Sequence, residues 1–373
     1  MDTRIEFLYL SEQDTIKAGV NNASECVEVC EEVFKLLAQG DYLMGGTNHN
    51  SHGIGIIFPK ESVFPNMPTA GPDRRFFAMP AYLGGRFDVC GNKWYGSNAA
   101  NTSKGFPRSI LTVLLNDKET GAPLCLMSAN LLSAARTGAI PAVAVRRLGR
   151  HNSEVCALLG CGPINKSCLR NIMTQAKNIK KIIFYDLFEE KAKEMADWAK
   201  KEYGVETEVS ADLPALLGEA DIVTVAASRI KPLFIEKKWL KKGALVLLSG
   251  PVRGDDEFWT DSKIVYDHIG LHEAYVEEAL ASGDKNNYYS GVIGGPIYNL
   301  IDQDKLIDLK DSTDIGHVIL GTREGRINDE ENIVFVACGM AVFDVAWGYE
   351  LYKRALEKGI GQKLLLWDVP ALS

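Results

Sequence analysis

The sequence predicts an α/β protein with a Rossmann-type, doubly wound parallel sheet and a second, mixed α+β domain. Three observations favour this fold class. From about residue 130, strand-like and helix-like segments alternate at the spacing that is typical of a parallel sheet. In this region an apolar run, VCALL, leads directly into Gly160-Cys161-Gly162. The first third of the chain instead has strands joined by a hairpin turn, which is typical of a mixed sheet.

The N-terminal domain is expected to cover residues 1–130. It opens with a short strand and a helix that ends at Gly40. Residues 47–80 are rich in Gly, Pro, Asn and His, so we expect them to form a loop. An Asn-Asp-Lys turn then joins two apolar strands into a hairpin. The expected elements are a helix over 23–39 and strands over 5–10, 87–94, 109–115 and 123–128.

The second domain is expected to cover residues 131–324 and to begin with a helix over 131–148. Its short apolar strands are separated by helices, which predicts parallel pairing. The expected strands are 155–159, 181–185, 206–209, 222–226 and 244–248, with helices over 166–175, 189–203 and 213–217. Towards the end of the chain, residues 332–356 are expected to form a strand that runs into a long helix.

Length and charge limit the class of protein. The chain has 373 residues, enough for two domains, and 46% of them are hydrophobic and 24% charged, as in ordinary soluble proteins. The formal net charge of −8 argues against a nucleic-acid partner, because phosphate backbones are attracted to basic surfaces.

Signals for membranes, export and metals are missing from the sequence. No apolar stretch has the length of a membrane span, and the acidic N-terminus lacks the regions of a signal peptide, so we expect a cytoplasmic protein. The eight cysteines form no CxxC pair, and no His, Asp or Glu completes a metal site with Cys26 and Cys30. We therefore expect buried free thiols and no bound metal.

The glycine-rich segment after VCALL is typical of a phosphate-binding loop. Gly160 suits the tight turn at the end of the strand, and Gly162 allows the backbone to approach a phosphate. Pro163 is favoured at the first position of a helix, where its missing N–H is no loss. Asn165 replaces the third glycine of the GxGxxG pattern, so we expect looser packing between the strand and the helix.

An acidic residue, Asp186, follows the next predicted strand, KIIFY. A carboxylate at this place accepts hydrogen bonds from both ribose hydroxyls and repels a 2′-phosphate. The pattern therefore predicts a dinucleotide site for NAD, with NADP less favoured. An ordinary surface aspartate after a strand is the alternative.

Two cationic residues outside this loop stand in apolar surroundings. Lys93 lies at the end of an apolar strand, and Arg136 lies in a helix of small and apolar residues, LLSAARTGAI. A buried guanidinium needs a partner for its charge, and a ligand carboxylate fits its planar fork. The alternatives are an internal salt bridge for Arg136 and an exposed strand end for Lys93.

Several motifs in order make the chain resemble the ornithine cyclodeaminase/mu-crystallin family. The resemblance covers nearly the whole chain, with weaker agreement over residues 41–75 and 250–315. The motifs are MPAYLGG, GNKWYGSN, Gly105-Phe106-Pro107, LNDKETGAPL, SAARTGA, GTREGRIND and IVFVACGMAVFDVA.

The resemblance implies a homodimer in which the N-terminal domain provides the subunit contact and the substrate pocket, and residues 325–373 return to that domain. It implies that Lys93 and Arg136 bind a substrate carboxylate and that Thr137 lies at the cofactor. The loop residues that match the family's phosphate site are Gly160, Gly162, Pro163 and Ile164, with Asp186 at the ribose. Ser228 is predicted to contact the cofactor as well.

The chain departs from the family pattern at two places. The family usually has a further arginine after the first helix, whereas this chain has MGGTNHNSHG, so His49, Asn48 or His52 is the predicted substitute. Where cyclodeaminases have an aspartate near the nicotinamide, this chain has Pro251, with Asp255 and Asp256 a few residues later.

The missing aspartate favours a reductase or dehydrogenase over a cyclodeaminase, because a cyclodeaminase moves protons among amine, imine and water at one carbon. The first hypothesis is an NAD-dependent oxidoreductase that acts on the C–N bond of a carboxylate-bearing amino acid or its imine. In it, Lys93 has a lowered pKa and donates a proton. The second is an ornithine-type cyclodeaminase with recycled NAD. The third is a nucleotide-dependent binding protein without turnover.

Overall fold

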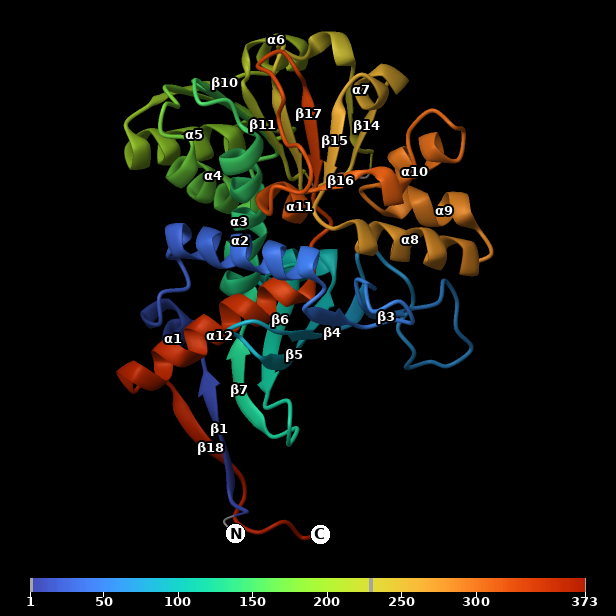
Figure 1. The fold of residues 1–373 in the computed structure, drawn as a ribbon. Helices are drawn as coiled ribbons and strands as arrows, with labels where there is room; N and C mark the ends of the chain where they lie inside the picture. The colour runs from blue at the N-terminus through green and yellow to red at the C-terminus, as the bar shows by residue number, and fades with distance from the viewer. Residues whose placement is uncertain (1–2, 228–230, 373) are drawn as a thin grey trace. The chain divides into compact units, whose positions relative to one another are not determined.

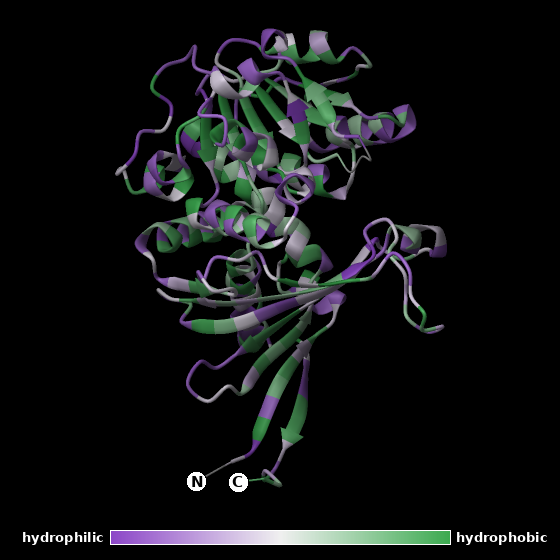
Figure 2. Cartoon of the chain, turned by 90° about the vertical axis from the view of Figure 1, so that its right-hand side faces the viewer, coloured by the Kyte–Doolittle hydropathy of each residue, from purple (hydrophilic) through white to green (hydrophobic). Residues whose placement is uncertain are grey.

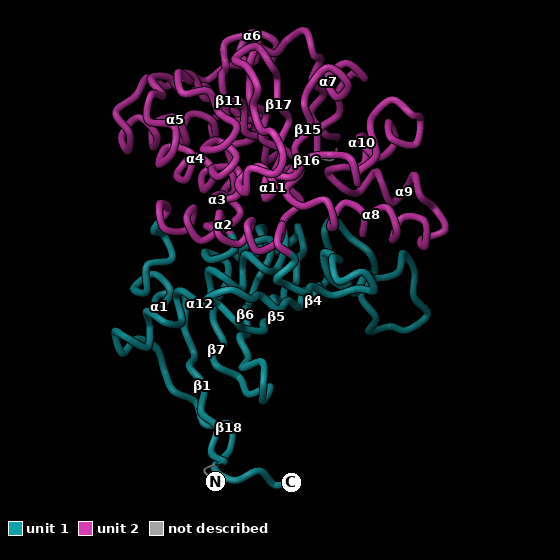
Figure 3. Tube along the Cα trace, viewed as in Figure 1, with its two compact units in different colours: residues 1–22, 40–133, 340–373 teal, residues 23–39, 134–339 magenta. Residues whose placement is uncertain are grey.

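The computed structural model describes residues 3–227 and 231–372, which form two compact units (Figures 1 and 3). Unit 1 contains the described parts of residues 1–22, 40–133 and 340–373, and unit 2 contains those of 23–39 and 134–339. One helix, α3 (Asn130–Leu148), contributes residues to both units. The predicted α/β fold class is confirmed.

Unit 1 is built on a mixed sheet with strand order β18-β1-β7-β6-β5-β4-β2, and β3 pairs with β4 beside this path. β1 and β7 run parallel, whereas the other neighbours are antiparallel. The elements of unit 1 are β1 (Ile5–Leu10), α1 (Glu12–Lys17), β2 (Tyr42–Met44), β3 (Ile54–Ile57), β4 (Arg75–Leu83), β5 (Val89–Ser97), β6 (Ser109–Asn116), β7 (Pro123–Ser128), α12 (Ala341–Lys358) and β18 (Gln362–Trp367).

Local chemistry explains the hairpin between β6 and β7. Asp117 Oδ1 accepts the backbone N–H of Thr120 at 2.8 Å, and Gly121 has a φ of 76°, which glycine adopts without strain. Helix α12 then packs on β4, β5 and β6. Its Trp347 is fully buried and donates through Nε1 to the carbonyl of Val20 at 3.3 Å. The last helix of the chain is therefore part of the core of the first sheet.

Residues 47–80 differ from the loop that the composition predicts. β3 and the first part of β4 lie in this stretch, and β4 pairs along its whole length with β5. The sequence around β4 contains Gly, Pro and Asn and does not by itself predict a strand. β4 forms because it pairs with β5, a separate segment of the chain.

Unit 2 contains an all-parallel sheet with strand order β10-β9-β8-β11-β13-β17-β15-β16. From β8 the chain winds outwards through β9 and β10, and from β11 it winds the other way, as in a Rossmann sheet. The strands are β8 (Val155–Leu159), β9 (Lys181–Tyr185), β10 (Glu206–Val209), β11 (Ile222–Val225), β13 (Leu245–Leu248), β15 (Lys263–Tyr266), β16 (Thr313–Asp314) and β17 (Ile333–Val336).

The central strands of this sheet form the core of unit 2. Every residue of β11, β13 and β17 is buried, and Figure 2 shows hydrophobic residues on strands of this sheet. The helices of unit 2 are α2 (Ala23–Gln39), α4 (Pro163–Gln175), α5 (Glu189–Tyr203), α6 (Leu213–Glu219), α7 (Asp256–Thr260), α8 (Ile269–Ala281), α9 (Lys285–Gly291), α10 (Gly295–Ile301) and α11 (Ile315–Ile319). Unit 2 also contains a small parallel pair, β12 (Leu233–Ile235) and β14 (Val252–Gly254).

The compact units divide the chain differently from the expected domains, above all at helix α2 and at residues 325–339. Helix α2 lies in unit 2, where it packs against α4 and α11 through an apolar face. Residues 325–339 also lie in unit 2, because β17 pairs with β13 and β15 at the centre of the parallel sheet. The C-terminal residues that pack in unit 1 begin at Met340.

None of the described helices combines the length and the apolar composition that a bilayer crossing requires. The eight cysteines are free thiols, and six of them are buried. Burial raises the pKa of the Cys125 and Cys156 thiols to about 12, so the thiol form is favoured at neutral pH.

Candidate cofactor and substrate site

The glycine loop lies at the carboxyl end of β8, beside β11, where the winding of the sheet changes direction. Gly160 has a φ of 95°, and a Cβ atom there would lie 2.9 Å from Cα of Ala227, so a side chain is excluded. Gly162 has extended backbone with open space within 4 Å of its Cβ position, and Pro163 begins α4. The loop therefore leaves room for a group at the N-terminus of a 13-residue helix.

Asn165 closes the loop instead of loosening it. The side chain is fully buried, and Nδ2 donates to the carbonyls of Leu159 and Gly160 at 3.1 and 2.7 Å. Its Oδ1 accepts from the hydroxyl of Thr224 on β11 at 2.9 Å. The expected loss of packing does not occur, because the amide ties α4 to both strands through hydrogen bonds.

Asp186 lies directly against the glycine loop. Its Oδ2 accepts the backbone N–H of Cys161 at 2.7 Å, and its Oδ1 accepts that of Phe188 at 3.0 Å. The carboxylate is half-buried at the end of β9, so it reaches the loop from the neighbouring strand. A ribose next to this loop would meet the carboxylate that the sequence predicts there.

Arg136 and Thr137 lie on α3 close to the start of α4. Arg136 is buried with 5% of its surface exposed, and Thr137 is half-buried. In the following turn, a Cβ atom at Gly138 would lie 2.4 Å from the backbone of Ser167, whose hydroxyl donates to the carbonyl of Ala134 at 2.7 Å. The small residues around Arg136 thus let α3 approach the helix that follows the glycine loop.

Lys93 is held by a buried ion pair within unit 1. Its Nζ lies 3.3 Å from Oδ2 of Asp344 on α12 and donates to the hydroxyl of Ser133 at 3.0 Å. The two charged residues are 4% and 0% exposed. This burial excludes the exposed strand end that was the alternative for Lys93.

Ser133 and Arg136 both belong to α3. The two residues are three positions apart in one helix, so they lie on the same helix face. Sequence reasoning missed Asp344, although it is part of the motif IVFVACGMAVFDVA. A lone aspartate among apolar helix residues was the available signal.

The sequence of the chain matches that of a known protein family. The family model of the ornithine cyclodeaminase/mu-crystallin family matches residues 20–359. The chain belongs to this family. The resemblance that the sequence motifs predict is therefore confirmed.

Relatives in this family align over most of the chain. N-((2S)-2-amino-2-carboxyethyl)-L-glutamate dehydrogenase of Staphylococcus aureus is 26% identical over 366 residues, which are 97% of this chain and 99% of that protein. The structure of Thermococcus litoralis Delta(1)-pyrroline-2-carboxylate reductase in complex with NADH and L-proline has a TM-score of 0.78 at 26% identity and covers 95% of this chain and 99% of that one. An archaeal alanine dehydrogenase dimer with bound NAD gives a TM-score of 0.78 at 26% identity and covers 97% of this chain and 100% of that one.

The segment that replaces the family's further arginine forms a turn in unit 1. Asn48 Oδ1 accepts the backbone N–H of Asn50 at 3.0 Å, so the amide shapes the turn itself. His49 is exposed in the left-handed region with a φ of 59°, and His52 packs edge-on to Phe77 with ring centroids 6.1 Å apart.

The two aspartates that follow Pro251 lie at the start of α7. Asp255 caps α7, where its Oδ1 accepts the backbone N–H groups of Phe258 and Lys237 at 3.0 Å each. Asp256 is exposed and pairs with Lys305. Both carboxylates therefore stabilise α7 and its neighbours. Ser228, the remaining predicted cofactor contact, lies outside the described residues.

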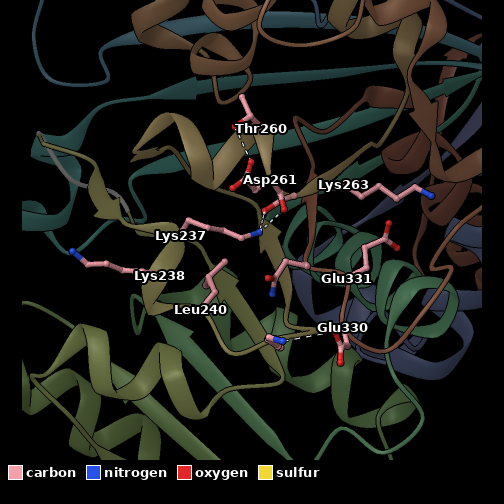
Figure 4. Close-up of a pocket in the computed structure, with 11 residues that line it drawn as sticks. Lys237, Lys238, Leu240, Thr260, Asp261, Lys263, Glu330 and Glu331 are labelled. Carbon is pink, nitrogen blue, oxygen red and sulfur yellow. Dashed lines mark hydrogen bonds and ion pairs between the residues drawn. The ribbon is translucent and has the colours of Figure 1, made fainter.

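A hollow of about 640 Å³ lies elsewhere in unit 2 and is lined by lysine and acidic residues (Figure 4). Its lining includes Leu240, Lys263 and Asn332, which lie at the amino ends of β13, β15 and β17. In parallel sheets ligands bind at the carboxyl ends, so this hollow is at the wrong edge for a cofactor. Lys237 in the hollow already donates to the carbonyl of Asp261 and to Ser262.

Proposed function

We propose that the protein is an NAD-dependent oxidoreductase that acts on the C–N bond of an amino acid or its imine. The observation on which this rests is a dinucleotide-type loop combined with two buried cations in a chain of this family. The relatives include a reductase with NADH and L-proline, an alanine dehydrogenase with NAD, and an N-substituted amino acid dehydrogenase. Their shared chemistry supports the proposal.

The cofactor is proposed to be NAD, held at the glycine loop. Gly160, Gly162, Pro163 and Ile164 would surround the phosphates, with Thr137 and Ser228 as further contacts. The open space at Gly162 fits this role. Asp186 would accept the ribose hydroxyls and repel a 2′-phosphate. When bound, NADH supplies a hydride to the imine carbon.

The substrate is proposed to be a small amino-acid-like compound whose carboxylate is bound by Arg136 and Lys93. The planar guanidinium accepts a carboxylate through two parallel hydrogen bonds, and the ammonium adds a point charge. Asp344 and Ser133 hold Lys93 in place. Reduction of an imine also requires one proton at nitrogen, and Lys93 in its ammonium form is the proposed donor. Asn48 and His49 stay the predicted substitutes for the family's further arginine.

The two parts of the chain are proposed to divide this work. Residues 131–324 would bind NAD, and residues 1–130 with 325–373 would bind the substrate and form a homodimer. An exposed apolar face on the unit 1 sheet supports the dimer: Phe76, Trp94 and Ile110 are 38%, 40% and 54% exposed, and Phe76 stacks on Trp94. A cytoplasmic location is proposed with it.

The test is an assay of the purified protein with NADH and a panel of cyclic imines and 2-oxo acids with amines, and with NAD and amino acids. Consumption of NADH with one of these substrates is expected, and Arg136→Ala is expected to abolish it. Ammonia and proline formed from L-ornithine with catalytic NAD and no net NADH would instead establish a cyclodeaminase. Ligand binding without turnover in any assay would favour a binding protein.

A further inference from the structure

A buried carboxylate, Asp267, lies at the carboxyl end of β15 and accepts four N–H groups. The residue is 1% exposed. Its Oδ2 accepts the backbone N–H groups of Cys338 and Gly339 at 2.7 and 3.1 Å. Its Oδ1 lies 2.9 Å from the backbone N of His268 and 3.0 Å from Nε2 of His272. The segment after β17 is thus fastened to the end of β15 through one side chain.

Two further buried side chains orient this carboxylate. His272 of α8 is fully buried, and its Nδ1 lies 2.6 Å from the hydroxyl of Tyr298 on α10, which is 1% exposed. Because a carboxylate only accepts, Nε2 of His272 donates to Asp267, while Nδ1 is hydrogen-bonded to the hydroxyl of Tyr298. The chain Tyr298–His272–Asp267 therefore fixes the orientation of each group.

The backbone that Asp267 holds lies against Arg136. Gly339 has a φ of 78°, and a Cβ atom there would lie 3.0 Å from Nη1 of Arg136. Glycine at this position allows the guanidinium to approach the main chain. The same peptide segment thus contacts the proposed carboxylate ligand on one side and the buried chain on the other.

We infer that Asp267, oriented by His272 and Tyr298, is a positioning residue for Arg136. It fixes the 338–339 backbone beside the guanidinium and so sets the orientation in which Arg136 receives a substrate carboxylate. The inference rests on the proposed function in one respect, the role of Arg136 as carboxylate ligand. Asp267, His272 and Tyr298 lie outside the cofactor loop. Substitutions there are therefore expected to change substrate binding more than NADH binding.

A second aspartate–histidine pair provides a matched control in the neighbouring strand. Asp314 ends β16 and is buried, and its Oδ1 lies 2.7 Å from Nδ1 of His317 and 2.9 Å from the backbone N of His317. This pair caps α11. It therefore resembles the Asp267 pair in chemistry but differs in what it holds.

The experiment compares His272→Gln, Tyr298→Phe and Asp267→Asn with the control His317→Gln. Amide hydrogen exchange of residues 337–340 is measured first, without substrate, and KM, kcat and the NADH dissociation constant follow. In His272→Gln and Asp267→Asn we expect faster exchange and a KM for the carboxylate substrate raised about 10–100-fold, with smaller changes in kcat and NADH binding. Tyr298→Phe keeps the ring and its packing, so it should fold even where Asp267→Asn does not, with a KM change of about 3-fold.

Each outcome decides the inference. Unchanged exchange in His272→Gln and Tyr298→Phe, or the same change in His317→Gln, would overturn the positioning chain. Faster exchange with an unchanged KM would overturn its role towards Arg136. If the wild-type protein turns over none of the substrates, the proposed function fails, and the exchange rates alone then decide whether the chain fixes residues 338–339.

Discussion

The cofactor loop and the pair Lys93–Asp344 are built by different means. In the loop, Cys161 and Asp186 are 25 positions apart, and the contacts use backbone groups and glycine conformations. In the ion pair, Lys93 and Asp344 are 251 positions apart, and side chains from β5, α3 and α12 meet. The proposed cofactor site therefore follows mainly from local sequence, whereas the proposed substrate site depends on the packing of distant elements.

The largest effect is expected from Arg136→Ala, which removes a proposed substrate ligand and leaves the loop intact. Loss of one partner of a buried charge pair typically costs about 2–5 kcal/mol, which corresponds to a fall of about 30- to 4,000-fold in kcat/KM. Steady-state kinetics measure this loss, and fluorescence titration with NADH should give a dissociation constant close to that of the wild type. Arg136→Lys keeps the charge without the fork and should lie between the two. A large loss of NADH affinity would show that Arg136 also contributes to cofactor binding.

Asp344→Asn tests the distant contact directly and should be next in size. The change leaves the buried Lys93 ammonium without a carboxylate, which costs on the order of 3 kcal/mol in the free energy of unfolding. The free energy of unfolding, measured by denaturant titration, and kcat/KM should both fall. The matched control is Glu350→Gln on the same helix, whose partner Arg86 is at the surface, so a change below about 1 kcal/mol is expected. Equal effects in the two variants would argue against a special role of the buried pair.

Asn165→Ala should weaken the loop by a smaller amount. The variant removes the amide that bonds Leu159, Gly160 and Thr224, and buried groups left unsatisfied cost about 1–3 kcal/mol. Differential scanning calorimetry should show a lower Tm, and NADH should bind more weakly, while the KM of the amino-acid substrate changes little. Asn171→Ala on the same helix, whose Nδ2 donates within α4 to Ser167, is the control. A fully retained NADH affinity would show that Asn165 does not shape the loop for the cofactor.

Asp186→Ser should give the smallest effect on catalysis and the clearest effect on cofactor choice. The substitution removes the charge that repels a 2′-phosphate, so the preference for NADH over NADPH should fall by roughly 10-fold, or about 1.4 kcal/mol. Titration with both dinucleotides measures this ratio. An unchanged preference would mean that another group selects the cofactor.

Several parts of the fold could be predicted from local sequence. The glycine turn after β8 and the alternation of strands and helices depend on neighbouring residues, and the parallel sheet confirms the alternation. The hairpin at Asp117–Gly121 was predictable for the same reason. Asn165 was misjudged, because its value lies in hydrogen bonds to β11 rather than in its size.

Contacts between distant segments could not be predicted in this way. The need of a buried Arg136 for a partner was predicted, but nothing near Lys93 or Arg136 in the sequence identified Asp344 or Gly339. For the same reason, the sequence did not predict that α2 packs in unit 2 or that β4 forms a strand in a segment with loop-like composition. In each case the partner comes from another element.

The fold class, the family, the phosphate-type loop and the importance of Lys93 and Arg136 could be predicted from the sequence alone. These predictions depend on spacing, on glycine and on residue type. Only the tertiary structure decided that Asp344 and Ser133 hold Lys93, that Asn165 fastens the loop, and that Asp267 holds the backbone beside Arg136. The physical reason is that a buried charge is stabilised by whichever group the fold brings within hydrogen-bond distance, and sequence separation does not limit that choice.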